Sequence, residues 1–224
     1  MNIKRYIATI ILAIVLLLNF SCTDWLDVKP VDRMSEDQLY STEAGFRQAL
    51  NGIYVELNHA DLYGDELLVN TVEILAQRYK FSSMGTLTNQ YHLAEFDYTT
   101  DYAKKCGSRI WEKAYALIAN VNKLLKNADS HKDLFTGDSY DLITGEAYAL
   151  RAFLHFDLLR LFGPVYKTHK EDKSICYNTQ FSLSGSDLLP ASKVMEYVIA
   201  DLKEAEDRLA KDPIIEEGPL LSDG

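Results

Sequence analysis

Apolar residues recur three and four positions apart through most of this chain, and that spacing constrains its fold more than any other feature. Side chains at these intervals share one face of an α-helix. The spacing predicts helices over residues 42–57, 68–79, 110–125, 143–162 and 191–209. The core of the chain is therefore predicted to be helical.

The first two segments are predicted to form an antiparallel pair. Ser41 or Thr42 can cap the first helix, because a hydroxyl accepts a hydrogen bond from the free N–H groups at a helix start. Its inner face carries Phe46, Ala49, Leu50, Ile53, Tyr54 and Leu57. After a break at residues 63–65, the pattern resumes with Leu68, Val72, Leu75 and Tyr79.

A second pair is predicted in the middle of the chain. Two neighbouring stripes cover a wide face of its first helix: Ile110, Ala114, Leu117, Val121 and Leu124 beside Trp111, Tyr115, Ile118 and Leu125. The apolar residues of its partner are Ala147, Leu150, Phe153, Leu154, Phe156, Leu158 and Leu161. Gly163 and Pro164 end the partner, since Pro cannot continue a helix. We expect this partner helix to be central.

The last predicted helix starts after Pro190, with Ser192 as its cap. Its inner face carries Val194, Val198, Leu202, Ala205 and Leu209. Its outer face carries two pairs of opposite charge four residues apart, Glu204 with Arg208 and Asp207 with Lys211.

Helix pairs that follow one another along a chain are typical of the tetratricopeptide repeat. We therefore predict an all-α, tetratricopeptide-like α-solenoid of antiparallel helix pairs with irregular loops. The last helix has no predicted partner after it, because residues 212–224 contain Pro, Gly and acids with little periodicity. Its face near Val198 and Leu202 lacks cover unless the helix folds back on the preceding pair, which hints at truncation.

The amino terminus has the layout of a secretory signal peptide. Lys4 and Arg5 precede an apolar stretch over residues 7–18 that only Thr9 interrupts. This stretch is too short for a membrane-spanning helix, which needs about 20 apolar residues. Residues 1–21 are therefore predicted to be removed on export.

Ser21 and Cys22 resemble a lipobox, in which the chain is cut before the cysteine and the thiol is diacylated. Asn19 and Phe20 depart from the usual lipobox, which has Leu and a small residue at those positions. Ordinary secretion with a free or paired Cys22 is the alternative. Acylation is our prediction, because a reactive, exposed cysteine at a mature amino terminus would be a liability. Several acyl chains would hold the protein to a bilayer almost permanently. Residues 22–40 would then lie next to the anchor.

Charge restricts the class of ligand. Removal of residues 1–21 takes away Lys4 and Arg5 and changes the net charge from −10 to −12. Such a surface repels nucleic acid, and no predicted helix face carries a cluster of Lys or Arg. Uncharged ligands such as sugars are not disfavoured.

The two other cysteines, Cys106 and Cys176, match no metal or redox motif. They can form a disulfide or stay as two thiols, and two thiols are the default expectation.

Five segments of the chain match sequence motifs of one known protein family. The longest is residues 145–165, and shorter ones lie at residues 26–28, 42–54, 111–122 and 199–202. These segments resemble the SusD/RagB family of outer-membrane nutrient-binding lipoproteins, in which the longest is similar to the signature helix and the shorter ones follow the family's order. This chain is thereby identified as a member.

The resemblance implies a helical lipoprotein that Cys22 anchors in the outer membrane, facing the cell exterior. Such proteins cover a SusC-type TonB-dependent transporter and deliver glycans to it. Residues 41–211 would form the N-terminal helical domain of the family, followed by an irregular tail over 212–224. Family members continue into a carboxy-terminal half, which this sequence does not contain.

Residues 78–102 are the best candidate for ligand contact, because glycan sites are shallow platforms of exposed aromatic and hydrogen-bonding side chains in loops. The segment crowds such residues into a stretch without helical period, where the family places part of its binding arc. The predicted contacts are Arg78, Tyr79, Phe81, Asn89, Tyr91 and His92, with Tyr91 and His92 as the preferred exposed residues. Alternatively, these rings pack the loop onto the helices.

Other conspicuous residues favour structural roles. Arg151 and Asp157 stand in an apolar helix and are predicted to be paired with neighbouring charges. Trp111 heads an inner stripe and is predicted to belong to the core. His155 has no second ligand at helical spacing, so we expect no metal site and no cofactor. Trp25 lies near the anchor and is a candidate for contact with the membrane or the transporter.

A surface glycoside hydrolase and a protein-binding helical-repeat scaffold are the alternative functions. Glycoside hydrolysis needs two carboxylates about 5 to 10 Å apart across a cleft. The acids of this chain lie mainly on predicted solvent-facing helix surfaces, and no nucleophile elbow, glycine-rich phosphate loop or zinc signature occurs. We therefore expect a binding protein and not an enzyme.

Overall fold

The structure, a computed structural model, describes residues 35–81, 85, 88–181 and 186–212. The predicted signal peptide 1–21, Cys22 and Trp25 lie outside the described residues, as does the tail from residue 213. The described residues form α-helices and one isolated antiparallel bridge between Lys173 and Pro190. No helix among them is both long and apolar enough to cross a membrane.

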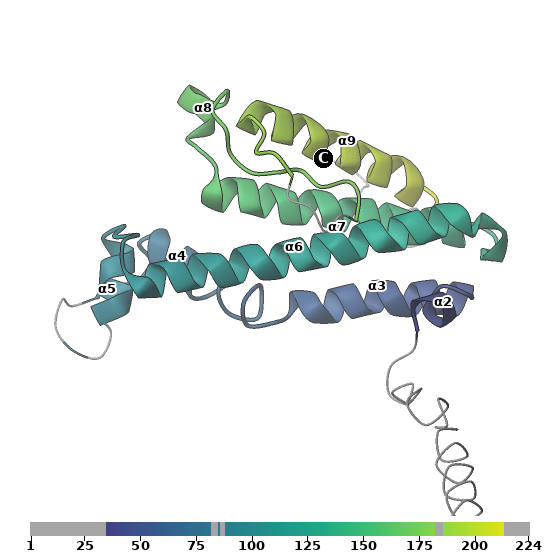
Figure 1. The fold of residues 1–224 in the computed structure, drawn as a ribbon, viewed down its shortest axis with the longest axis horizontal. Helices are drawn as coiled ribbons and strands as arrows, with labels where there is room; N and C mark the ends of the chain where they lie inside the picture. Colours follow the sequence, from purple (N-terminus) through teal and green to yellow (C-terminus); the bar gives the residue numbers. More distant parts are fainter. Residues whose placement is uncertain (1–34, 82–84, 86–87, 182–185, 213–224) are drawn as a thin grey trace, which may run out of the picture. The chain divides into compact units, whose positions relative to one another are not determined.

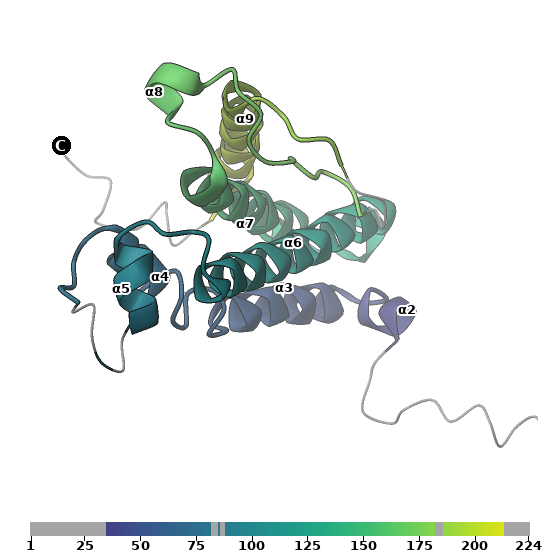
Figure 2. The same cartoon turned by 60° about the vertical axis from the view of Figure 1, so that its left-hand side comes forward.

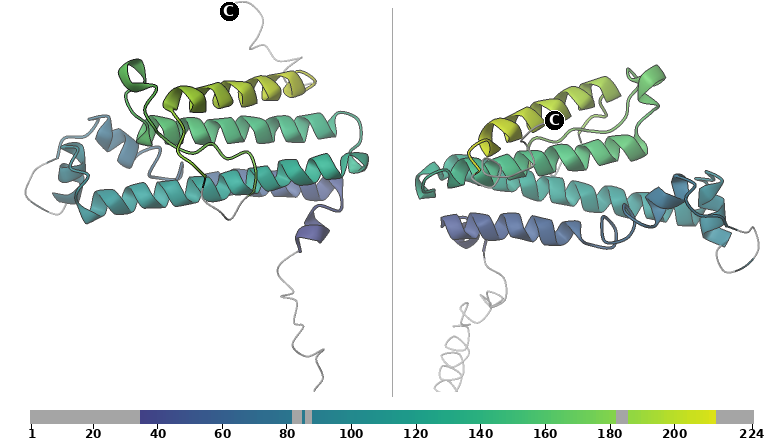
Figure 3. Two further views of the ribbon diagram at one scale, coloured as in Figure 1. Left: turned by 45° about the horizontal axis from the view of Figure 1, so that its top comes forward. Right: turned by 180° about the vertical axis from the view of Figure 1, so that it is seen from behind.

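Long helices dominate this part of the chain: α3 (Glu43–Leu57), α6 (Asp101–Ser130), α7 (Ser139–Phe162) and α9 (Ala191–Leu209) (Figure 1). Each packs on the next and runs antiparallel to it, so that α3, α6, α7 and α9 follow one another in space (Figures 2 and 3). The shorter elements are α2 (Glu36–Leu39), α4 (Thr71–Leu75), α5 (Thr88–Ala94), the 3-10 helix η2 (Lys132–Leu134) and α8 (Tyr166–His169). The predicted all-α, tetratricopeptide-like fold class is confirmed.

Thr42 caps α3, one of the two predicted choices. Its hydroxyl oxygen accepts a hydrogen bond from the N–H of Gly45 at 3.1 Å, whereas Ser41 donates to a carbonyl oxygen in the preceding turn. The buried face of α3 contains Phe46, Leu50 and Ile53. Tyr54, predicted to face inward, is exposed, and its hydroxyl donates to Glu146 of α7 at 2.7 Å.

Residues 68–79 do not form the predicted second helix, and their predicted pairing with α3 is wrong. The helical part is the five-residue α4, and α3 packs against α6 instead. The preceding residues form turns around a buried carboxylate, because Glu66 accepts hydrogen bonds from both Arg109 of α6 and Thr71. Leu68 and Tyr79 consequently remain exposed.

The predicted central pair is present as α6 and α7. The stripes of α6 bury Ile110, Ala114, Leu117, Ile118, Val121, Leu124 and Leu125, while Trp111 and Tyr115 are half-buried. α7 is central as predicted, since α3, α6 and α9 all pack against it. Gly163 ends it, and its N–H donates to the Leu159 carbonyl at 2.9 Å. Phe153 and Phe156, which the spacing grouped with the apolar residues of this helix, are exposed.

α9 begins after Pro190 as predicted, but Ser192 does not cap it. The Ser192 hydroxyl donates instead to the carboxylate of Glu171 at 3.1 Å. Leu202 is 47% exposed, contrary to its predicted inner position, and the neighbouring Asp201 turns inward. Because α9 folds back on α7, Val198 is buried without any further helix.

One of the two predicted ion pairs on the outer face of α9 forms. Arg208 lies 2.7 Å from Glu204, as the spacing predicts. Lys211 pairs with Asp138 and Asp141 near the start of α7, and not with Asp207. The end of α9 is therefore tied to the start of α7.

A buried ion pair joins α7 to α9. The Nε and Nη2 atoms of Arg151 donate to the two carboxylate oxygens of Asp201, each at 2.7 Å. The Nη1 atom donates to Asn122 of α6 at 2.9 Å, and the hydroxyl of Tyr177 donates to Asp201. The prediction that Arg151 is a paired structural charge is confirmed.

His155 lies fully buried one helical turn after Arg151. Its Nδ1 lies 2.8 Å from the Arg151 carbonyl, so Nδ1 carries the proton, and its Nε2 accepts from the N–H of Asn178 at 3.0 Å. Burial lowers the pKa of His155 to about 4. The ring stacks on Tyr177 at 3.9 Å between centroids, which together with Asn178 holds residues 174–180, here called the strap, on α7. Cys176 of this strap and Cys106 are both free thiols.

Arg151→Ala should lower the free energy of unfolding by about 3–5 kcal/mol, because it leaves the Asp201 carboxylate buried without its partner. Urea unfolding followed by circular dichroism measures the change. Lys193→Ala is the matched control. The Lys193–Glu196 pair, also on α9, is solvent-exposed, so its loss should leave the free energy of unfolding nearly unchanged. Similar stability for the two variants would contradict this account.

Acid should destabilise the fold through His155. The unfolded histidine takes up a proton below about pH 6.5, whereas the folded one stays neutral down to about pH 4. Stability is therefore lost as the pH falls through this window. Between pH 7 and pH 5, the wild type should lose roughly 2 kcal/mol more unfolding free energy than His155→Gln. Parallel pH profiles for the two proteins would refute the assignment.

Candidate functional site

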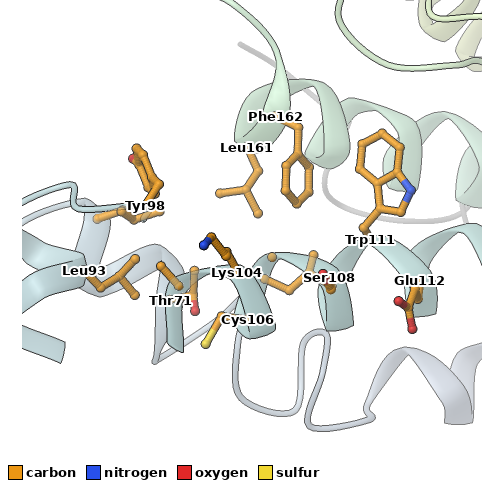
Figure 4. A pocket seen from close by; sticks show the side chains of 14 residues that line it. Thr71, Leu93, Tyr98, Lys104, Cys106, Ser108, Trp111, Glu112, Leu161 and Phe162 are labelled. Carbon is orange, nitrogen blue, oxygen red and sulfur yellow. The ribbon is translucent and has the colours of Figure 1, made fainter. Parts of the chain in front are cut away.

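A cavity of about 560 Å³ opens where the first half of α6 passes the end of α7, and we call it the α6–α7 pocket (Figure 4). Parts of α4, α5 and the turn after α5 complete its wall. The lining residues are Thr71, Leu75, Leu93, Tyr98, Ala103, Lys104, Cys106, Gly107, Ser108, Ile110, Trp111, Glu112, Leu161 and Phe162. The volume lies within the usual range for small-molecule sites.

Aromatic rings enter this pocket from two sides. Trp111 of α6 and Phe162 of α7 meet edge to face, with ring centroids 5.2 Å apart and planes at 86°. Tyr98 faces them across the opening (Figure 4). Gly107 lies beside these rings, and a Cβ there would make an ordinary van der Waals contact with the Phe162 ring at 3.6 Å. The half-buried Trp111 is thus a wall of the pocket at the edge of the core.

Polar groups line one side of the pocket. Lys104, Ser108 and Glu112 follow one another at four-residue intervals and therefore share a face of α6. Thr71 adds a hydroxyl, which the buried Glu66 holds by a hydrogen bond at 2.5 Å. Glu112 is the single carboxylate in the lining that the structure describes. The pocket therefore presents both apolar surface and groups that donate and accept hydrogen bonds.

A charged cluster fixes the pocket wall from behind. Arg109 of α6 binds Glu66, which is 2% exposed, and lies 3.6 Å from Asp61. This cluster attaches the turns after α3 to α6 and so positions α4 beside the pocket. Within the residues described, no three His, Cys, Asp or Glu side chains gather as a metal site requires.

The structure places Arg78, Tyr79 and Phe81 just after α4, outside the α6–α7 pocket. Arg78 is exposed and lies 3.8 Å from Glu73. The Tyr79 hydroxyl donates to the Val69 carbonyl at 3.0 Å, and its exposed ring meets the half-buried Phe81 edge-on. Tyr79 and Phe81 are therefore in contact with each other, whereas Arg78 pairs with Glu73 of α4.

Asn89, Tyr91 and His92 lie on α5, so the prediction of a non-helical segment is wrong for residues 88–94. Tyr91 and His92 are half-buried and pack edge-on at 5.7 Å, and the His92 side chain keeps 42% of its surface exposed. Asn89 is exposed and lines a second, open hollow of about 610 Å³ with Thr99, Thr100, Asp101, Tyr102 and Lys105. Ligand contact by the six predicted residues stays a prediction; they are Arg78, Tyr79, Phe81, Asn89, Tyr91 and His92.

A family model of SusD-like type, described as starch-binding associating with outer membrane, matches residues 24–216. The chain belongs to the SusD-like family. The SusD-like match extends over all the helices described above, so the resemblance carried by the sequence motifs is confirmed.

Two SusD-like relatives come from Formosa agariphila. SusD-like protein P2 is 27% identical over 208 residues, which is 92% of this chain and 38% of P2. SusD-like protein P25 is 27% identical over 148 residues, which is 64% of this chain and 28% of P25. The chain thus spans less than two fifths of the length of either SusD-like relative.

Solved SusD-like structures share the fold. A SusD superfamily protein from Bacteroides fragilis matches with a TM-score of 0.62 and 18% identity over 74% of this chain and 39% of that protein. A SusD-like carbohydrate binding protein from Bacteroides vulgatus matches with a TM-score of 0.61 and 22% identity, over 74% and 35%. At such identities the likeness establishes the helical architecture alone.

Proposed function

We propose that this SusD-like chain is a cell-surface glycan-binding lipoprotein that captures oligo- or polysaccharide and delivers it to a SusC-type TonB-dependent outer-membrane transporter. The match of residues 24–216 to a family described as starch-binding and associated with the outer membrane carries the proposal. Because the chain spans only part of its relatives, capture and delivery are proposed for the whole protein to which these residues belong.

The α6–α7 pocket supports sugar as the ligand class. A sugar ring has apolar faces that pack on aromatic side chains and a rim of hydroxyls that form hydrogen bonds. The pocket offers Trp111, Phe162 and Tyr98 for the faces. Lys104 and Glu112 can donate to and accept from the hydroxyls, and their opposite charges favour a neutral ligand.

Binding explains this pocket better than hydrolysis. Glycosidases of the common type use two carboxylates, one on each side of the scissile bond. Glu112 has no second carboxylate beside it in the lining that the structure describes. A hydrolase is therefore the weaker alternative, and a protein-binding scaffold does not account for the aromatic pocket.

Trp111→Ala should weaken glycan binding by about tenfold, because the ring supplies stacking surface worth about 1–1.5 kcal/mol. Affinity electrophoresis of the full chain against a panel of glycans measures retardation. Tyr197→Ala removes an exposed ring of α9 outside the pocket and should leave retardation unchanged. Failure of every glycan to retard the wild type would refute the proposed function.

Membrane attachment is proposed through a diacylated Cys22, with residues 1–21 removed and the helices outside the cell. Cys22→Ala should release the protein from outer membranes and abolish its co-purification with a TonB-dependent transporter, since the acyl chains supply the attachment. Membrane fractionation and mass spectrometry of the amino terminus check this. An unmodified thiol on membrane-bound wild type would contradict the proposal.

A further inference from the structure

Two phenylalanines on α7 face solvent. Phe153 is 44% exposed and Phe156 is 36% exposed. Being three residues apart, they share the face of α7 that its neighbouring helices leave open. Exposed rings side by side on an otherwise well-covered helix require an explanation, because apolar surface in water is unfavourable.

Tyr63, from the turns after α3, supports the first of these rings. It stacks on Phe153 with centroids 5.1 Å apart and an interplanar angle of 23°. Its hydroxyl donates to an Asp157 carboxylate oxygen at 2.7 Å. Burial, together with that hydrogen bond, raises the pKa of Tyr63, so the hydroxyl keeps its proton at neutral pH. Tyr63 is thereby fixed in ring plane and in hydrogen bonding.

Arg160 supports the second ring. Its Nη1 donates to the other oxygen of Asp157 at 2.7 Å, and its guanidinium carbon lies 5.8 Å from the centroid of Phe156. The side chain is 60% exposed, and its Nε and Nη2 have no hydrogen-bond partner among the described residues. Asp157 therefore links Tyr63, which supports Phe153, to Arg160, which supports Phe156. The Nε and Nη2 groups of Arg160 can still donate hydrogen bonds to a ligand.

We propose that Phe153, Phe156, Tyr63, Asp157 and Arg160, here called the aromatic strip, form a second glycan subsite that takes a neutral pyranose ring. The inference rests on the proposed function and adds a contact that the α6–α7 pocket does not contain. One ring of the strip packs on the sugar face. The hydroxyls then bond to the Arg160 donors and the free lone pairs of Asp157.

Two properties of the strip favour a sugar over a polypeptide. The negative charge of Asp157 and the positive charge of Arg160 cancel, so the strip suits an uncharged ligand that both donates and accepts hydrogen bonds. The rings and charges are also fixed before binding, because each contacts another member of the strip. Rigid, exposed aromatic surface loses little conformational entropy when a ligand arrives.

A glycan long enough to reach both the α6–α7 pocket and the aromatic strip would bind more tightly than a short one. Once the pocket holds one end of the glycan, binding at the strip takes place within the same complex. The doubly substituted Phe153→Leu/Phe156→Leu chain keeps apolar volume but removes both ring faces. It should bind the retarded polysaccharide roughly tenfold more weakly than wild type while keeping its affinity for a short oligosaccharide of the same sugar.

Isothermal titration of the full chain with both ligands provides the measurement, and Tyr197→Leu serves as the matched aromatic control. Arg160→Ala is a second variant with little risk to folding, because the side chain is largely exposed, and a loss of polysaccharide affinity is expected there too. Unchanged polysaccharide binding by both variants, with a wild type that binds, overturns the strip and leaves the proposed function intact. If the variants bind glycan normally but no longer co-purify with the transporter, the strip is a protein interface and the glycan subsite is refuted.

Discussion

The buried ion pair between Arg151 and Asp201 is the interaction on which the arrangement of the long helices depends. Two charges leave water at this point, and their attraction offsets that cost only when every remaining hydrogen-bonding position is filled. Asn122 of α6 and Tyr177 of the strap fill them. The helices α6, α7 and α9 and the strap must therefore all be aligned for these hydrogen bonds to form. This alignment places α9 against α7.

Helix spacing predicted α6 and α9 well because each buries a periodic face over most of its length. It predicted α7 because apolar residues lie on nearly every side of that helix. It failed for residues 68–79, where the decisive contact joins Glu66 to Arg109, 43 residues away. It failed again at Leu202, since the adjacent Asp201 takes the inward position to meet Arg151. Local periodicity reports which residues could share a face but not which carboxylate is drawn into the interior.

The candidate site was harder to predict than the fold. Trp111 and Phe162 belong to different helices, and they form a pocket only because α7 ends opposite the first half of α6. Composition instead pointed to residues 78–102, which supply only part of the pocket lining, among it Leu93 and Tyr98. Other aromatic side chains of that segment pack on one another. Membership of the SusD-like family, by contrast, could be read from residues 145–165, most of which lie on α7, the helix against which α3, α6 and α9 pack.

The same crowding explains where ligand-binding surface can arise on this fold. A helix that is apolar all round must be covered all round, and α7 has α3, α6 and α9 against it. Its remaining face carries Phe153 and Phe156, which stay in water only beside the polar groups of Tyr63, Asp157 and Arg160. The contacts within this surface form without a ligand, so the rings already have their positions before binding. Packing thus dictates which face of α7 is left for recognition, and the polar partners of its rings restrict what can be recognised there.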